Sequence, residues 1–226
     1  YDTSELALDS FNRQSGLPSV SNEQAEEKFE AKLLYRWDLS ANQKFATGLQ
    51  GRHNNFSRQS EGESITGPWQ TLNYAILAEH QWQPTEQWTT FLGGRIDKGR
   101  YTDTLFSPRV AIAYQSDEQS VWKLMGNRSL RIPPELTSRN NAELGQAIIQ
   151  AETLDVIELR YHHNTSENLF WEVGTFVQNL QAIDSVGPSQ RNVGQYKTFG
   201  LSFEVDYLTE QWDIRFSHSY IKLLDA

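Results

Sequence analysis

Histidines are the first side chains in this sequence to consider as metal ligands or catalytic bases. His162 and His163 are adjacent, and on a strand adjacent side chains point to opposite faces, so the pair cannot share a metal ion. His53, His80 and His218 are isolated, and the last two fall on apolar faces. We therefore expect structural histidines near a strand end or an interface, and no metal site.

Serines and carboxylates give no catalytic pattern either. The sequence has no Gly-x-Ser-x-Gly motif, and spacing connects no serine with a histidine. The pairs Glu26-Glu27 and Asp117-Glu118 lie in polar connections and indicate solvated charge. Calcium-loop, phosphate-loop and zinc spacings do not occur, and there is no cysteine. We expect no enzyme activity and no cofactor.

Arginine and aromatic residues in the connections are the candidate ligand contacts, because loops on a rigid scaffold commonly carry recognition. Arginine and aromatic rings suit anionic, aromatic chelates. For each residue taken singly, a solubilising loop surface is the alternative. The candidates are Arg58, Trp69, Arg100, Tyr101, Arg131, Arg139, Arg191 and Tyr196.

Composition limits what these residues can do. The 226 residues are 38% hydrophobic and 22% charged, with a net charge of −9 and no basic stripe, which argues against nucleic-acid binding. The longest apolar runs, such as Ala75–Ala78, are about four residues, too short for a transmembrane helix. Half-apolar transmembrane strands remain compatible with this average.

Period-two alternation runs from Phe29 to Tyr220 and predicts β-strands. We expect about eleven strands, several of ten to fifteen residues, joined by connections that are alternately short and long. A first strand is expected near Ser4–Asn12, and a short helix is expected at Asn141–Gln150. The other predicted strands are Lys28–Asp38, Lys44–Asn54, Trp69–Gln83, Trp88–Asp97, Ser107–Gln115, Val121–Arg128, Thr153–His163, Leu169–Ile183, Gln195–Tyr207 and Trp212–Leu224.

The alternating faces indicate which side would meet lipid. In each of three strands, large aromatic residues lean toward the ends of one face and aliphatic residues toward its middle, as a membrane-spanning strand requires. The opposite faces are polar or charged. The three apolar sets are Leu72, Tyr74, Ile76, Ala78, His80 and Trp82; Phe199, Leu201, Phe203, Val205 and Tyr207; and Trp212, Ile214, Phe216, His218 and Tyr220.

This pattern predicts an all-β fold: an antiparallel up-and-down meander of about 10–12 long strands, as in a transmembrane β-barrel. We expect residues 1–226 to be one barrel domain and a piece of a longer protein. The sequence starts without a Met or a signal peptide.

Five passages in order resemble the TonB-dependent outer-membrane receptors. Phe106–Ile112 is similar to that family's Ser-Pro-Arg strand start, and Arg128–Leu136 to its Phe-Arg-Ala-Pro…Glu-Leu passage. Ala151–Leu159 resembles its Pro-Glu…Glu-Leu-Gly strand, Asn192–Glu204 its Asn-x-Gly…Gly-x-Glu strand, and Trp212–Asp225 the strand after it. Ala151 and Arg160 stand where the family usually has Pro and Gly.

The resemblance implies a receptor barrel in the outer membrane of a Gram-negative bacterium, in contact with outer-membrane lipid. Its substrate would be a small molecule, such as a ferric siderophore or another metal chelate, taken up with energy from TonB. TonB would act through a plug domain that this sequence lacks. Such transporters resemble 22-stranded barrels with a plugged lumen, so the resemblance implies that about eleven strands form a partial (half) transmembrane β-barrel.

Two other classes of protein remain open at this point. A soluble β-sandwich carbohydrate-binding module would pack its apolar faces against each other and use Trp and Tyr as sugar platforms. A small autonomous outer-membrane barrel, either a pore or an enzyme, would pair its first strand with its last.

Overall fold

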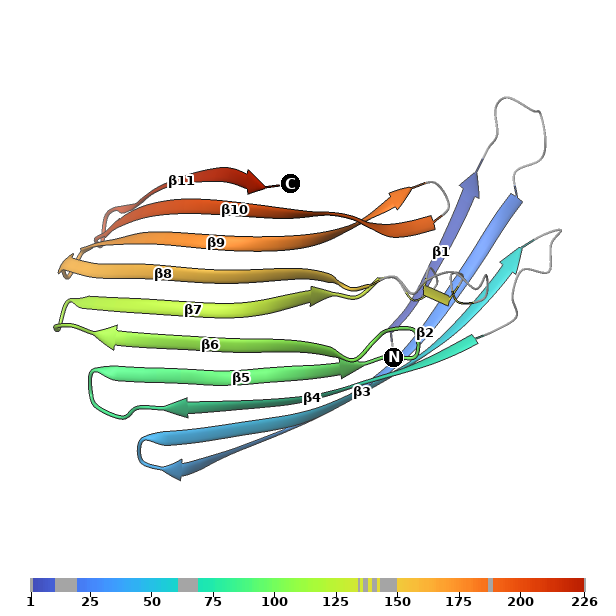
Figure 1. The fold of residues 1–226 in the computed structure, drawn as a ribbon, viewed down its shortest axis with the longest axis horizontal. Coiled ribbons are helices and arrows are strands. Elements are labelled where there is room, and N and C mark those ends of the chain that lie inside the picture. Colours follow the sequence, from blue (N-terminus) through green and yellow to red (C-terminus); the bar gives the residue numbers. More distant parts are fainter. Residues whose placement is uncertain are drawn as a thin grey trace.

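The computed structural model describes residues 2–10, 20–60, 69–133, 135, 138, 139, 142, 150–186 and 189–225; of their side chains, it describes those of 27–56, 69–133, 135, 138, 139, 142, 150–182 and 194–225. The described strands form one antiparallel sheet of eleven strands in sequence order (Figure 1). They are β1 (Asp2–Ser10), β2 (Val20–Ser40), β3 (Gln43–Ser60), β4 (Trp69–Trp82), β5 (Trp88–Lys98), β6 (Leu105–Gln115), β7 (Ser120–Arg131), β8 (Glu152–Ser166), β9 (Leu169–Val186), β10 (Ser189–Leu208) and β11 (Asp213–Asp225).

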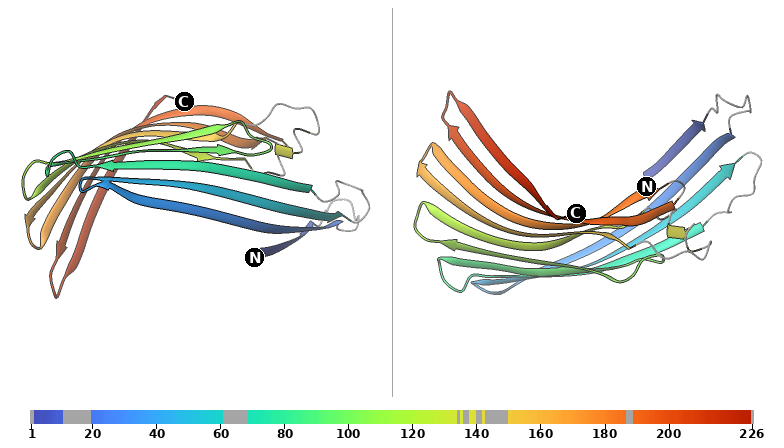
Figure 2. Two further views of the ribbon diagram at one scale, coloured as in Figure 1. Left: turned by 90° about the horizontal axis from the view of Figure 1, so that it is seen from below. Right: turned by 45° about the horizontal axis from the view of Figure 1, so that its top comes forward.

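The sheet is curved into an open trough with β1 and β11 as its two edges (Figure 2). The expected meander of a partial barrel is therefore confirmed. A β-sandwich is wrong for this chain, because its strands pair in a single sheet and apolar faces of two sheets do not meet. The small closed barrel is also wrong for these residues, since β1 pairs with β2 and β11 with β10 but not with each other.

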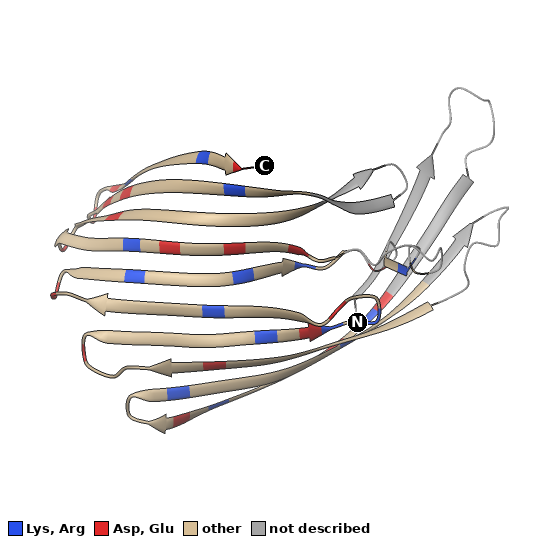
Figure 3. Cartoon of the chain, in the orientation of Figure 1, with Lys and Arg blue, Asp and Glu red and all other residues tan. Residues whose placement is uncertain are grey.

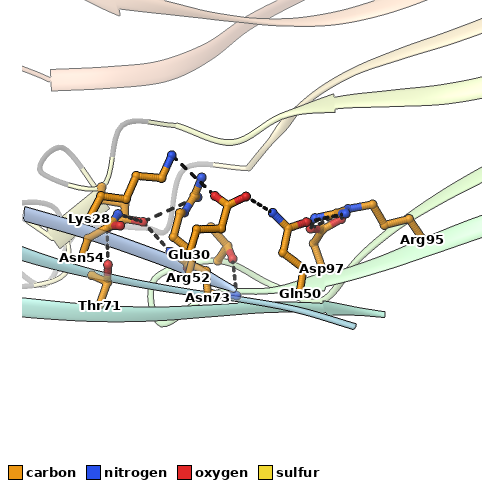
Figure 4. Close-up of polar contacts among 12 residues, drawn as sticks. Lys28, Glu30, Gln50, Arg52, Asn54, Thr71, Asn73, Arg95 and Asp97 are labelled. Atoms are coloured by element: carbon orange, nitrogen blue, oxygen red, sulfur yellow. Dashed lines mark hydrogen bonds and ion pairs between the residues drawn. The ribbon is translucent and has the colours of Figure 1, made fainter. Parts of the chain in front are cut away.

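Alternation decides which side chains face each side of the trough. On β4, Trp69, Thr71 and Ala75 are buried, whereas Leu72 and Tyr74 between them are more than half exposed. Strand register carries this division across the sheet. Lys28, Gln50 and the other residues labelled in Figure 4 project into the concave side, so the apolar face, whose residues alternate with them, is convex.

The convex face has no protein cover. The described residues bury only four hydrophobic side chains below a tenth of their area: Phe56, Trp69, Ala75 and Ala151. Large apolar residues such as Leu33, Leu92 and Ile157 are instead about two-thirds exposed. A continuous apolar surface of this kind needs a non-aqueous neighbour. The three apolar sets expected from sequence share the convex face, which suits the hydrocarbon of a bilayer.

Strand lengths differ from expectation mainly at one end of the trough. Strands β2, β3 and β10 extend several residues beyond their predicted bounds, through polar segments such as 20–27 and 55–60. These segments lack the apolar alternation that marks a strand in the sequence, but their backbones pair in regular register. The tight turns at the other end lie where they were predicted, except that β8 continues through Ser166, so the turn expected at Asn164–Ser166 lies instead at Glu167 and Asn168.

The predicted helix at Asn141–Gln150 falls almost wholly outside the described residues. The backbone is helical at Glu135, Ser138, Arg139 and Ala142, so the helical part begins earlier than expected. Among the described residues, no helix is long and apolar enough to span a membrane.

Candidate ligand-binding site

A chain of polar contacts crosses the concave face between β2 and β5 (Figure 4). The Gln50 amide donates to Glu30 at 2.8 Å, and Arg95 donates to the Gln50 oxygen at 2.9 Å and to Asp97 at 2.7 Å. The strand between β3 and β5 presents only Ala75 at this level, and this small side chain lets Gln50 and Arg95 meet above it. The wall is thereby both polar and internally cross-linked.

An aromatic–arginine cluster, made of Phe56, Trp69, Arg100, Tyr101 and Arg139, lies at the long-connection end of β3–β5. The Phe56 and Trp69 rings stack with centroids 3.9 Å apart, and the Tyr101 ring meets Trp69 edge-on at 6.4 Å. The Arg139 guanidinium carbon lies 5.1 Å from the Trp69 centroid, and that of Arg100 lies 5.6 Å from the Tyr101 centroid. Both distances are within the range of cation–π attraction.

The members of the cluster differ in exposure. Phe56, Trp69 and Arg139 are each less than a tenth exposed, because Trp69 is covered by Phe56 and by Arg139. Arg100 is exposed and Tyr101 is half-buried. The first three therefore form a packed floor, and Arg100 and Tyr101 are the members that solutes can reach.

Beside the cluster, four strand residues converge on the carboxylate of Glu135. Asn54 and Asn73 donate their side-chain N–H groups to Oε1 at 3.3 and 2.5 Å, and the Thr71 hydroxyl donates to Oε2. The Arg52 guanidinium lies 4.0 Å from Oε1. We call Arg52, Asn54, Thr71 and Asn73 the carboxylate cradle; Figure 4 shows these four residues on β3 and β4.

Glu135 and Arg139 reach these two places from one side of a helical segment. They are four residues apart with helical backbone at both positions, and residues four apart lie on the same helix face. This face ties the β7–β8 connection to β3 and β4, although the sheet places three strands between β4 and β8. It is the long-range contact that shapes the site.

Four of the eight predicted ligand contacts thus lie together: Trp69, Arg100, Tyr101 and Arg139. Arg131 is apart from them, at the end of β7, where it pairs with Glu152 of β8. Tyr196 lies in β10, in the other half of the sheet. Arg58 and Arg191 lie in β3 and β10, and their side chains are outside the described ones.

The expectation that all eight lie in loops is wrong for five of them, because strands β3, β4, β7 and β10 include these positions. Sequence reasoning also missed Phe56 and the four cradle residues. Glu135 did carry a signal, since it belongs to the Arg128–Leu136 passage that resembles the receptor family. Its partners carried none, because they lie at least 62 positions away in sequence.

Further round the wall, Arg160 links two acidic residues. Its guanidinium donates to Glu158 and to Glu172, both at 2.7 Å. The arginine thereby neutralises two carboxylates of β8 and β9 on the concave face. Charged residues lie along the strands and not only at their ends (Figure 3).

The histidines are separated as expected: strand register puts His162 opposite Glu172 on the concave face and His163 opposite Trp171 on the convex face. A serine–histidine contact that spacing could not reveal does occur, with Ser120 Oγ 2.9 Å from His163 Nδ1. Ser120 is 2% exposed, so a substrate cannot reach its hydroxyl. Within the described part of the chain, no three His, Asp or Glu side chains are grouped to hold a metal ion.

Comparison with protein families matches residues 2–225 to the TonB dependent receptor-like β-barrel. The chain belongs to this family. A search among curated proteins gave no match. In a transmembrane barrel the apolar face meets lipid and the polar face lines the lumen, which agrees with the exposed apolar convex face and the polar concave face of this sheet.

Solved structures show the same fold. The copper transporter OprC superposes with a TM-score of 0.72 at 16% identity, over 97% of this chain and 43% of OprC. The FrpB iron transporter from Neisseria meningitidis (F3-3 variant) gives 0.70 at 15% identity, over 92% and 37%. The siderophore receptor PirA from Pseudomonas aeruginosa gives 0.70 at 14%, over 90% and 44%. The chain therefore spans less than half the length of these receptors.

Proposed function

We propose that this receptor barrel forms part of the wall of a transporter that takes up a small anionic metal chelate, most simply a ferric siderophore, across the outer membrane of a Gram-negative bacterium. The aromatic–arginine cluster is the observation that carries the proposal. It gathers four arginine and aromatic residues singled out from sequence into one place on the lumen side. Arginine and aromatic faces together attract anionic, aromatic chelates.

In this proposal the strands have a mechanical role and the cluster has a chemical one. The cross-linked polar wall from Glu30 to Asp97 keeps the long-connection end of β2–β5 rigid. The cluster captures the chelate before it passes into the lumen. Energy for uptake would come from TonB through a plug domain that sits inside the barrel and is contributed by other residues. None of these steps requires covalent chemistry by the wall.

The similar solved structures support a metal-related substrate, since they include an iron transporter, a siderophore receptor and a copper transporter. At 14–16% identity these neighbours show the fold alone. The choice of an anionic aromatic chelate therefore rests on the cluster. Arg100 and Tyr101 supply the accessible surface for it.

The test is substitution of the accessible members. Arg100→Ala and Tyr101→Ala each should weaken binding of a ferric catecholate by about tenfold, because a cation–π or stacking contact contributes about 1 kcal/mol or more. Binding is measured by fluorescence quenching on the purified full receptor, and uptake by radioactive iron in cells. Arg128→Ala, the same change on the convex face, is the matched control. If all three variants bind ferric catecholate with equal affinity, the cluster does not take part in recognising the chelate.

A further inference from the structure

The carboxylate cradle is more than a single ion pair. Donors from β3 and β4 meet both oxygens of one planar group, with Asn54 and Asn73 on Oε1 and Thr71 on Oε2 of Glu135. The Glu135 side chain is 18% exposed, so these bonds replace most of its hydration. The number and placement of the donors match a carboxylate, whose two oxygens accept several hydrogen bonds in one plane.

Glu135 does not use all the donors that the cradle offers. The Arg52 guanidinium stays 4.0 Å from Glu135, outside hydrogen-bond distance. Its Nε atom is buried and makes no hydrogen bond within the described part of the chain. Next to it lies a cavity of about 50 Å³ bordered by Arg52, Asn73 and Ile132. A carboxylate on a separate molecule could take up the arginine fork fully, which the tethered Glu135 does not.

We propose that the cradle is a ligand site for a carboxylate of the transported chelate, and that Glu135 occupies it as an internal stand-in when no chelate is bound. The inference rests on the proposed function and deepens it, because it assigns the chelate at least one carboxylate. Exchange is a simple displacement: the ligand carboxylate accepts the bonds from Asn54, Thr71 and Asn73, and the Glu135 carboxylate returns to water. No covalent bond is made or broken.

Displacement of Glu135 also changes the neighbouring cluster. Glu135 and Arg139 share one helical face, and Arg139 covers the Trp69 ring at 5.1 Å. When the carboxylate of Glu135 leaves the cradle, one of the contacts that fix this helical face against β3 and β4 is lost. The Trp69 face then becomes available to an aromatic part of the chelate. One ligand carboxylate thus uncovers an aromatic platform two residues along β4 from Thr71.

Glu135→Ala empties the cradle and is the direct test. Acetate and citrate, which contain no iron, should bind to the purified full receptor carrying this change, as seen by saturation-transfer NMR. We expect binding about tenfold weaker, or none, in the unsubstituted receptor, because Glu135 competes for the same donors. Acetamide, the neutral analogue of acetate, should not bind to either protein.

Two further variants keep the test independent of folding. Glu135→Gln retains the shape and the hydrogen-bonding oxygen, so it should fold normally and bind citrate with an intermediate affinity. Glu135→Ala combined with Thr71→Val and Asn73→Ala removes donors, and acetate binding should disappear.

Acrylamide quenching of Trp69 fluorescence tests whether the ring is uncovered. The Trp69 signal is identified by difference from Trp69→Phe, and its quenching should increase in Glu135→Ala.

The outcomes separate this inference from the proposed function. If acetate and citrate bind no better to Glu135→Ala or Glu135→Gln than to the unsubstituted receptor, Glu135 is only a structural latch and the inference is overturned. Arg100→Ala would still report on chelate capture in that case. The opposite result is also possible to distinguish. If acetate binds to the emptied cradle but the Arg100 and Tyr101 substitutions leave the affinity for ferric catecholate unchanged, the carboxylate site stands and the catecholate substrate is overturned.

Discussion

Gly200 shows how a single residue fixes the packing between two strands of the wall. Gly200 of β10 lies opposite Phe176 of β9 on the concave face. A Cβ atom on Gly200 would come within 2.2 Å of the Phe176 ring, whereas a Cβ on Gly51 would meet nothing within 4 Å. The absence of a side chain at Gly200 therefore lets the aromatic ring lie flat against the sheet, and Gly51 serves as the control.

We predict that Gly200→Ala destabilises the barrel by about 1–3 kcal/mol, because overpacking forces the Phe176 ring out of its position. Gly51→Ala should change the free energy of unfolding by less than about 0.5 kcal/mol, as expected for a surface change. Urea unfolding of the receptor in lipid vesicles measures both. The double variant that combines Gly200→Ala with Phe176→Ala should lose less unfolding free energy than the two single variants together. Strict additivity would mean that contact with the Phe176 ring does not cause the loss.

Asp117 gives the short turn between β6 and β7 a pH dependence. The Gln119 backbone N–H donates to Asp117 Oδ1 at 2.8 Å. This bond, with smaller contributions from the Ser120 and Ser116 hydroxyls, holds the pKa of the Asp117 carboxyl below its ordinary value of 3.8. Because the folded pKa is the lower one, the stabilisation is complete above pH 3.8 and disappears as pH falls through the folded pKa.

Asp117→Asn should therefore lower the unfolding free energy at neutral pH and have a smaller effect as pH is reduced below 3.8. Urea titrations of both proteins between pH 3 and pH 7 measure the difference. Glu118→Gln removes the same charge from the next residue, which accepts none of these hydrogen bonds. A pH-independent effect of Asp117→Asn would assign the turn's stability to something other than the charged carboxyl.

At the scale of the strands, a polar row on the convex face marks the end of the apolar surface that is nearer to the long connections. Arg128, Asp155, Asn179 and Lys197 lie opposite one another in turn across β7–β10, on the convex face. Arg128 donates to Asp155 through two hydrogen bonds, at 2.6 and 2.8 Å. From Tyr207 up to Lys197, the convex side of β10 crosses about 25 Å at the usual strand tilt, which is the height of the apolar band in such barrels.

We predict that the cost of a convex-face cation depends on its depth along β10. Leu201→Arg, near the middle of the band, should destabilise the barrel by about 2–4 kcal/mol, and Gln195→Arg, above the polar row, by about 0–1 kcal/mol. Folding into lipid vesicles from urea measures both. Equal costs would mean that the apolar band is not centred on Leu201.

The strands were the part of this fold that the sequence could predict. Alternation in Phe199–Tyr207 or Leu72–Trp82 is local, so one strand reveals its own faces and the tight turns reveal its end. The outer parts of β2 and β3 could not be predicted, because polar residues pair there without an apolar face. The carboxylate cradle could not be predicted either, because Glu135, in the β7–β8 connection, meets Asn54 and Thr71 only once the strands between them have curved the wall.

At the scale of the whole molecule, the open edges decide what kind of barrel this sheet can join. Among the described strands, β1 pairs only with β2 and β11 only with β10, which leaves a row of unpaired backbone groups on each edge. In a bilayer such edges must be satisfied by further strands, since lipid offers no hydrogen bonds. A wall of eleven strands with a lumen lined by Arg95, Arg160 and similar side chains fits the larger barrels that enclose a plug.

Cross-linking tests that conclusion directly, because the chain has no cysteine of its own. Glu204→Cys with Ser217→Cys, on paired positions of β10 and β11, should join efficiently through a short bifunctional thiol reagent. Leu6→Cys on β1 with Ser217→Cys should not join, since these positions lie on opposite edges of the trough. Altered gel mobility measures both. Efficient joining of Leu6→Cys to Ser217→Cys would mean that the two edges meet; a lumen of eleven strands would then have no room for a plug, and chelate uptake would lose its mechanical basis.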